Sequence, residues 1–366
     1  MSEKIRNIVV VCTAVCFLAG FFIGCLVKPQ DEISLSERRQ LAQFPQVGGK
    51  EIISGKFMKE FEKYASDQFP LREEFRQVYG TVSTEILRQS DMDGLYLMED
   101  MAIAKEYPLR EKSLQHAVDI FQNIYDRYLK EQGGEIYLSL IPDKNYFLRE
   151  DQRVLSMDYD SFFEYMKNAL PQMKYLDITP YLELEDYYRT DPHWRQEKIV
   201  DVAQYLAEQM GTSVPGNYDV NEVDSLFYGS YVGRAARKLP GEKMYYLTNE
   251  AMENCRVYDH QNNREMEMYD QKKAKGRDPY EMYLSGSLSY VTIENPEVTE
   301  EKELIIFRDS FGSGIAPLLA EGYSKITLLD VRYISSYTLG SLVDFSDSDV
   351  LFLYSTSVLN HSETLK

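Results

Sequence analysis

Two short segments carry side chains that could perform nucleophilic catalysis. The first, Thr190–Trp194, contains the only tryptophan and one of the four histidines of the chain. The second, Arg308–Gly314, places Ser310 before a Gly-Ser-Gly run. Serine is a weak nucleophile until an adjacent base removes its proton, and a third group must orient that base. We therefore expect Ser310 to be the nucleophile, His193 the general base and Asp191 the group that orients it.

Each segment also has a purely structural interpretation. Asp191 would be a suitable helix N-cap, with Pro192 as the first helical residue. Asp309 and Ser310 would serve equally well as an ordinary helix start. A glycine-rich turn can also bind phosphate, but the chain contains neither GxGxxG nor GxxxxGK[ST]. Catalysis is the better interpretation because the Asp–His pair and the serine are both expected at strand ends.

Several neighbouring residues are candidates for accessory roles. Gly312 and Gly314 would let a substrate approach the backbone closely, and free N–H groups there could hold an oxyanion. Gly229, before Ser230, could add a second oxyanion donor, although a turn explains it equally well. Arg332 and Tyr333 follow another predicted strand and could contact substrate; a surface ion pair is the alternative.

The remaining histidines and the cysteines favour no metal or cofactor. His116 lies in a predicted amphipathic helix, His260 in a polar region, and His361 follows the last strand as a spare candidate base. Three of the four cysteines lie in an N-terminal apolar run, so Cys255 stands alone in the soluble part. No CxxC or Cys/His ligand pattern is present. We expect no metal and no bound organic cofactor.

Alternating helix and strand patterns predict the elements that position these residues. Short apolar runs bounded by turn residues indicate strands, and amphipathic helices separate them. This alternation predicts an α/β fold with a mostly parallel sheet flanked by helices. In such sheets, functional side chains gather beyond the carboxyl ends of the strands. The predicted strands are Ile136–Ile141, about Tyr175–Ile178, Leu304–Phe307, Lys325–Leu329 and Asp349–Tyr354.

The N-terminal segment predicts a membrane anchor. A short basic stretch precedes an uncharged apolar run, Ile8–Val27, which would span about 30 Å as a helix. A cleaved signal peptide has a shorter run and a small-residue cleavage site, whereas Lys28-Pro29 follows here. We expect a single-pass, uncleaved anchor at the cell membrane with the remainder extracytoplasmic. Cleavage and lipidation at Cys25 is the alternative.

Three regions follow from these patterns. Residues 1–30 are the cytoplasmic tip and anchor, 31–90 a membrane-proximal helical segment, and 91–366 the α/β domain. Apolar stripes on two helices, at 57–65 and 75–86, are interpreted as packing. A hairpin with an acidic turn is expected at 91–104. The region at about 215–296 is polar, rich in tyrosine and without clear periodicity. We expect it to be a long insertion or a small antiparallel subregion.

Composition limits the class of protein. The 366 residues are 44% hydrophobic and 13% aromatic, which is enough to form a core. The net charge is −19 and no basic patch occurs, so we expect no nucleic-acid partner. The 29 tyrosines suit a carbohydrate-binding cleft, or ordinary half-buried packing.

The chain resembles the DHHW family, relatives of the alginate O-acetyltransferases AlgX and AlgJ with an SGNH-hydrolase-like fold. Besides the Asp-x-His and Asp-Ser-Phe segments, the resemblance lies in Ser36–Pro45, Ser66–Arg72, the hairpin after Gly94, Pro142–Lys144 and Asp330–Tyr333. One departure is Pro192, where the name motif of the family has histidine. The aspartate and the second histidine are retained.

The resemblance implies the same three residues as a triad: nucleophile Ser310, base His193 and orienting Asp191. It further implies an extracytoplasmic O-acetyltransferase acting on a cell-surface polysaccharide, with a multi-spanning membrane acyltransferase partner on the donor side. A carbohydrate acetylesterase with the same triad is the first alternative. A non-catalytic polysaccharide-binding or scaffold subunit is the second.

Overall fold

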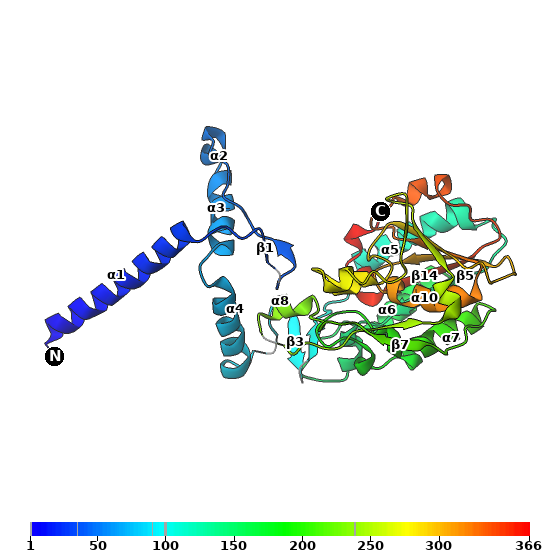
Figure 1. The fold of residues 1–366 in the computed structure, drawn as a ribbon, viewed down its shortest axis with the longest axis horizontal. Coiled ribbons are helices and arrows are strands. Elements are labelled where there is room, and N and C mark those ends of the chain that lie inside the picture. Colours follow the sequence, from blue (N-terminus) through cyan, green and yellow to red (C-terminus); the bar gives the residue numbers. More distant parts are fainter. Residues whose placement is uncertain (1, 35, 90, 99–100, 238) are drawn as a thin grey trace. The chain divides into compact units, whose positions relative to one another are not determined.

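The computed structural model describes residues 2–34, 36–89, 91–98, 101–237 and 239–366 (Figure 1). The chain forms two compact units. The first comprises Met1–Gln89 together with Val232–Lys238, and the second comprises Ser90–Tyr231 together with Leu239–Lys366. The second unit contains both segments that the sequence marks for chemistry.

An eight-stranded sheet organises the second unit, with the strand order β10-β9-β11-β13-β12-β14-β5-β6. The five strands from β13 to β6 are parallel, whereas β11, β9 and β10 pair antiparallel at one edge. The mostly parallel sheet confirms the predicted fold class. The strands are β5 (Ile136–Ile141), β6 (Lys174–Tyr175), β9 (Arg256–Asp259), β10 (Arg264–Met266), β11 (Tyr290–Glu294), β12 (Glu303–Arg308), β13 (Lys325–Leu329) and β14 (Asp349–Ser355).

Helices cover both faces of this sheet. Along β12, Leu304 and Ile306 pack on one side with α7 (Val200–Gln209) and α10 (Gly312–Leu319). Ile305 and Phe307 pack on the other side with the second helical layer. Successive strand residues point to opposite faces, so a strand buried on both sides is apolar throughout. The second layer consists of α5 (Glu111–Ile124), α6 (Tyr159–Ala169) and α11 (Thr356–Asn360).

The order in which the chain adds strands to the sheet reverses at β12. From β12 the chain proceeds to β13 on one side, then returns to place β14 on the other side. Crossovers that leave a strand in opposite directions open a crevice beyond its carboxyl end. Ser310 follows β12 directly and therefore lies at this point of the fold.

Strands of the 215–296 region belong to two different sheets. Its strands β9, β10 and β11 extend the main sheet, while β7 (Asp219–Glu222) and β8 (Tyr245–Thr248) form a separate antiparallel pair. Between these elements, a buried aromatic cluster includes Tyr280 and Tyr283, and it packs against Tyr188. These tyrosines are 4% exposed or less, as expected for packing side chains. Short helices α8 (Tyr231–Ala235) and α9 (Glu250–Glu253) complete the region.

The predicted hairpin is confirmed as β3 (Leu95–Met98) and β4 (Met101–Ala104), paired antiparallel. Its acidic turn at 99–100 lies outside the described residues. The predicted strand near residue 175 is shorter than expected: β6 covers only Lys174–Tyr175, and irregular turns follow it. Leu176 nevertheless continues the contact, since its N–H donates to Leu138 O at 2.8 Å.

The first unit contains the apolar helix α1 (Glu3–Val27), which is long and apolar enough to cross a membrane. It also contains two small strands, β1 (Ile33–Ser34) and β2 (Arg39–Gln40), and three further helices. These helices are α2 (Gly49–Ile53), α3 (Lys56–Asp67) and α4 (Arg72–Thr81). A π-helical turn, Val82–Ile86, continues α4.

The apolar stripe predicted at 75–86 is largely exposed within the unit, so a role as packing in the interior of the unit does not apply to it. The α4 face that is buried within the unit carries Gly80 and Ser83, while Val78 and Tyr79 are about 60% exposed. Small side chains let another segment approach the helix backbone closely, so the face with Gly80 and Ser83 packs inside the unit. On α3, in contrast, Phe57 and Tyr64 are half-buried and contact the ring of Phe44.

The two N-terminal segments that carry the family resemblance contact each other. Arg39 donates to both carboxylate oxygens of Asp67 at 2.8 and 2.5 Å, and Ala42 N donates to the same carboxylate. The Arg39 guanidinium lowers the pKa of Asp67 to about 2. These segments therefore hold the first unit together.

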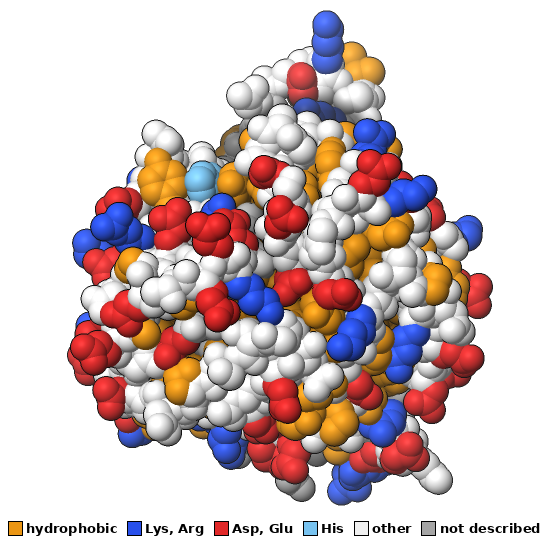
Figure 2. Space-filling view, turned by 90° about the vertical axis from the view of Figure 1, so that its right-hand side faces the viewer, with side chains coloured by type: hydrophobic (Ala, Val, Ile, Leu, Met, Phe, Trp, Pro, Cys, Tyr) orange, Lys and Arg blue, Asp and Glu red, His pale blue; other side chains and the backbone are white. Residues whose placement is uncertain are grey.

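On the face shown in Figure 2, acidic and basic side chains are interspersed.

Candidate active site

The Thr190–Trp194 segment lies in an irregular loop and not at a helix start. Helix α7 begins only at Val200, so the prediction that Asp191 caps a helix begun by Pro192 is wrong. Asp191 Oδ1 instead accepts from the backbone N–H of His193 at 3.3 Å, which closes a local turn. Its Oδ2 accepts from Ser230 N at 2.8 Å. A contact distant in sequence thus competes successfully with the local capping signal.

Asp191, His193 and Ser310 form one continuous hydrogen-bonded chain. His193 Nδ1 lies 2.5 Å from Asp191 Oδ1, and His193 Nε2 lies 2.7 Å from Ser310 Oγ. A buried carboxylate accepts but does not donate when ionised, so Nδ1 carries the proton and Nε2 is free to accept from the serine. Asp191 is 1% exposed, whereas the His193 side chain is 13% exposed. The arrangement has the geometry of a base oriented toward a hydroxyl.

The turn that presents Ser310 is fixed by the preceding aspartate. Asp309 Oδ1 accepts from Phe311 N at 3.0 Å. Asp309 Oδ2 accepts from the backbone N–H and the hydroxyl of Ser355, at 2.8 and 2.7 Å, at the end of β14. Helix α10 then begins at Gly312, where a Cβ would lie 2.7 Å from Arg308 Cβ. Glycine is needed at 312 because the helix starts against that side chain.

Arg308, the last residue of β12, stabilises the turn that carries Ser310. It is completely buried, and its guanidinium donates to Ser313 Oγ at 3.1 Å and to Leu288 O at 3.1 Å. The carboxylate of Asp330 lies 4.0 Å away. Burial lowers the pKa of Arg308. The guanidinium thus connects the start of α10 with the segment before β11, and both contacts stabilise the turn that carries Ser310.

Two charged residues hold the loop containing Asp191: Glu242, which the sequence did not single out, and Lys144, from a segment that carries the family resemblance. Glu242 accepts from the N–H groups of Arg189 and Thr190 at 3.0 and 3.1 Å, and from Thr190 Oγ1. Lys144 is buried, and its Nζ donates to Tyr188 O at 2.8 Å. Burial lowers the pKa of Lys144 to about 7, and the nearby carboxylates oppose that shift.

A tyrosine from the 215–296 region contacts the base directly. The rings of His193 and Tyr280 are stacked at a centroid distance of 3.8 Å and an angle of 7°. The ring of Phe311 lies 4.8 Å from the imidazole. Trp194 is fully buried, and its indole N–H donates to Phe311 O at 3.2 Å. Packing is thus the role of Trp194, while no sequence pattern marked Tyr280 because its region lacks periodicity.

Three of the accessory residues predicted from the sequence, Gly229, Gly312 and Arg332, already have partners within the chain. Gly229 N donates to Thr190 Oγ1 at 2.8 Å, and Gly312 N donates to Asp309 O at 3.2 Å. Arg332 forms an ion pair with Asp330 at 2.6 Å, and Tyr333 is 54% exposed. Oxyanion binding by Gly229 and Gly312, and substrate contact by Arg332 and Tyr333, therefore stay predictions.

Two of the other histidines have partners outside the hydrogen-bonded chain. His361 Nε2 lies 3.2 Å from Glu106 Oε2, and the ring of His260 stacks on Tyr290 at 4.0 Å. His116 lies on α5. Among the described residues, no group of three His, Cys, Asp or Glu side chains is arranged to hold a metal ion.

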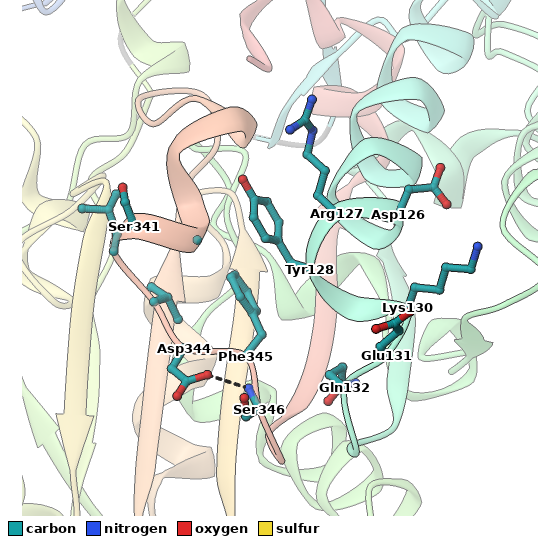
Figure 3. A pocket seen from close by; sticks show the side chains of 13 residues that line it. Asp126, Arg127, Tyr128, Lys130, Glu131, Gln132, Ser341, Asp344, Phe345 and Ser346 are labelled. Carbon is teal, nitrogen blue, oxygen red and sulfur yellow. Dashed lines mark hydrogen bonds between the residues drawn. The ribbon is translucent and has the colours of Figure 1, made fainter.

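A hollow of about 790 Å³ lies elsewhere on the second unit (Figure 3). Its lining includes Gln132 and Ser346, which precede β5 and β14, so it lies at the amino ends of the parallel strands. The rings of Tyr128 and Phe345 stack in it at 5.3 Å. Ser310, in contrast, follows the carboxyl end of β12. The pocket and Ser310 therefore lie at opposite ends of the parallel strands.

Solved structures share this fold. A DHHW family protein from Eubacterium siraeum is 17% identical, with a TM-score of 0.57; the match covers 75% of this chain and 95% of that one. The chain has the fold of a DHHW family protein. PatB1 from Bacillus cereus matches at 19% identity and a TM-score of 0.56, covering 72% of this chain and 96% of PatB1.

The DHHW-like fold also relates the chain, more distantly, to the O-acetyltransferase domain of Pseudomonas putida AlgJ. That match has 10% identity and a TM-score of 0.45, and covers 73% of this chain and 92% of that one. No protein-family model and no curated protein matches the sequence. The relation is therefore structural and distant.

Proposed function

We propose that this protein is an extracytoplasmic, membrane-anchored serine O-acetyltransferase that modifies a cell-surface polysaccharide. The observation that carries the proposal is the chain Asp191–His193–Ser310, with contacts of 2.5 and 2.7 Å. A purely structural pair would not need the serine hydroxyl within reach of the imidazole. The DHHW-like fold and the apolar helix α1 agree with this proposal.

The reaction follows from the positions of the three side chains. His193 Nε2 removes the proton of Ser310 Oγ as this oxygen attacks the acetyl carbonyl carbon of the donor. Asp191 stabilises the imidazolium and keeps Nδ1 protonated. The imidazolium then protonates the leaving group of the donor, and acetyl-Ser310 remains. A sugar hydroxyl, deprotonated by His193, attacks the acyl-serine, releases the acetylated sugar and restores the Ser310 hydroxyl.

Acyl donor and acceptor define the partners. We propose that a multi-spanning membrane acyltransferase delivers the acetyl group and that the polysaccharide supplies the acceptor hydroxyl. The same three residues would make a carbohydrate acetylesterase if water replaced the sugar. The two activities differ in one measurable respect, because only the transferase gives an acetylated glycan.

Substitution of the nucleophile tests the proposal. Ser310→Ala should abolish acetyl release from 4-nitrophenyl acetate and acetylation of added oligosaccharide. Ser341→Ala is the matched control, since Ser341 lines the pocket at the amino ends of the strands and its hydroxyl donates to the nearby Thr338 O at 2.7 Å. Acetyl release by Ser310→Ala at the wild-type rate would exclude serine catalysis. Acetyl release without acetylated glycan would favour the esterase.

A further inference from the structure

Helix α4, with the residues at its two ends, exposes a continuous apolar face. Its large side chains recur at spacings of three, four and seven residues, which places them on one face of a helix. Their exposed fractions lie between 46% and 70%. We call these residues the α4 stripe: Leu71, Phe75, Val78, Tyr79 and Ile86.

The interior of the first unit does not use this stripe. The buried residues of α4 and its π-helical turn are Gly80 and Ser83. A Cβ on Gly80 would lie 2.5 Å from Ala236 O, so this glycine allows the 232–238 segment to pack directly on the helix backbone. Helices of soluble domains bury the large apolar face, whereas α4 buries its small one. A contiguous exposed apolar face of this kind indicates a binding surface.

Contacts with α1 indicate what covers the stripe. The ring of Phe21 in α1 stacks on Phe69 at 5.2 Å and 9°, and lies 5.7 Å from Phe75. A Cβ on Gly24 would lie 3.2 Å from Pro70. Phe21 is six residues before Val27, the end of the helix, which corresponds to about 9 Å along its axis. The start of α4 is therefore level with the apolar part of α1 and not with its end.

We propose that the α4 stripe is embedded among the lipid acyl chains of the leaflet in which α1 ends. The inference rests on the anchoring role proposed for α1. Amphipathic helices at a membrane surface bury their apolar face about 5–10 Å below the headgroups, which is the depth that the contact of Phe21 with Phe75 requires. Arg72 and Arg76 on α4 are paired with Glu37, at 2.7 and 3.4 Å, and stay at the headgroup level.

Site-specific fluorescence in lipid vesicles tests this surface. The full chain, with Cys12, Cys16, Cys25 and Cys255 replaced by serine, receives one cysteine through Val78→Cys or Thr81→Cys. Thr81 is exposed on the same helix but outside the stripe, which makes it the matched control. Each variant is labelled with an NBD fluorophore and reconstituted into phosphatidylcholine–phosphatidylglycerol vesicles. Collisional quenching by doxyl-labelled lipid is then measured for each position.

We expect quenching at position 78 to exceed that at position 81 by about threefold or more, because only the stripe reaches the acyl chains. Equal quenching at the two positions would overturn the inference. An apolar emission shift at 78 without lipid quenching would also overturn it, and would indicate protein as the covering partner.

A third label separates this inference from the proposed anchoring. A variant that retains only native Cys16, inside α1, should be quenched by the same lipid. Quenching at Cys16 but not at position 78 would leave the anchor in place and exclude the stripe from the membrane. Absence of quenching at Cys16 would contradict the anchor itself.

Discussion

The imidazole of His193 lies flat on the ring of Tyr280, at 3.8 Å and 7°. This tyrosine comes from the 215–296 region, whereas His193 comes from the loop before α7. Tyr280 itself is only 4% exposed. The ring face, and not the hydroxyl, is thus the group that contacts the histidine.

Removal of the Tyr280 ring should slow acetyl transfer without preventing folding. In Tyr280→Leu the imidazole loses one wall and can tilt away from Ser310 Oγ, and we expect kcat to fall by up to about 10²-fold with little change in KM. Tyr280→Phe keeps the stacked ring and should retain wild-type kcat. The rate of Ser310 sulfonylation by methanesulfonyl fluoride should follow kcat.

A second stacked pair provides the control for this prediction. Tyr290 stacks on His260 at 4.0 Å and 10°, outside the hydrogen-bonded chain of Ser310. Tyr290→Leu should therefore leave both kcat and the sulfonylation rate unchanged. Wild-type kcat in Tyr280→Leu, or an equal loss in Tyr290→Leu, would show that the stack on His193 does not position the base.

Substitution of the orienting carboxylate should separate geometry from chemistry. Asp191→Asn retains an acceptor for Ser230 N, but an amide can no longer hold Nδ1 protonated and stabilise the imidazolium. We expect kcat to fall on the order of 10⁴-fold, with the thermal midpoint lowered only slightly. Steady-state kinetics and calorimetry measure the two effects. A loss below about tenfold would argue against a triad mechanism.

The turn before the nucleophile should be the most sensitive structural position. Asp309→Ala leaves three donors without an acceptor, namely Phe311 N, Ser355 N and Ser355 Oγ. A buried unsatisfied donor costs about 1–3 kcal/mol, so the variant should unfold at a lower denaturant concentration and lose acetyl release. Ser355→Ala removes only one of these contacts and should have a smaller effect in both measurements. An effect of Ser355→Ala as large as that of Asp309→Ala would contradict this ranking.

The catalytic candidates could be predicted from the sequence because their signals are local and the fold is regular. Asp191 and His193 are two residues apart, and Ser310 directly follows an apolar strand pattern. A mostly parallel sheet brings loops from the carboxyl ends of its strands to one edge, so residues 117 positions apart can meet there. The positions of the main parallel strands along the chain followed from the same periodicity.

The supporting residues could not be predicted because their contacts are distant in sequence. Tyr280 and Glu242 lie in the region without periodicity, and each meets its partner only in the folded chain. The cap expected at Asp191 was wrong for a related reason, since Ser230 N occupies the second carboxylate oxygen. On α4 the periodicity identified an apolar face correctly but contained no information on what covers it.

Lys144 makes the stability of the second unit depend on pH. Its side chain is buried, and burial lowers the pKa of its ammonium from 10.5 to about 7, while Asp191 and Glu242 oppose the shift. Between these two values the unfolded chain holds a proton that the folded chain has released. The free energy of unfolding must therefore rise with pH across this window, by up to about 1.4 kcal/mol per pH unit from this residue. Below pH 7 both states are protonated and the contribution is constant.

Comparison with Lys144→Met isolates this contribution. Methionine fills a similar volume and does not titrate, so the wild type should gain stability relative to the variant as the pH rises from 7 toward 10.5. Denaturant unfolding at several pH values across this window measures the difference. Lys174→Met, at an exposed lysine, should run parallel to the wild type. Parallel curves for Lys144→Met as well would show that the ammonium is not buried behind the Asp191 loop.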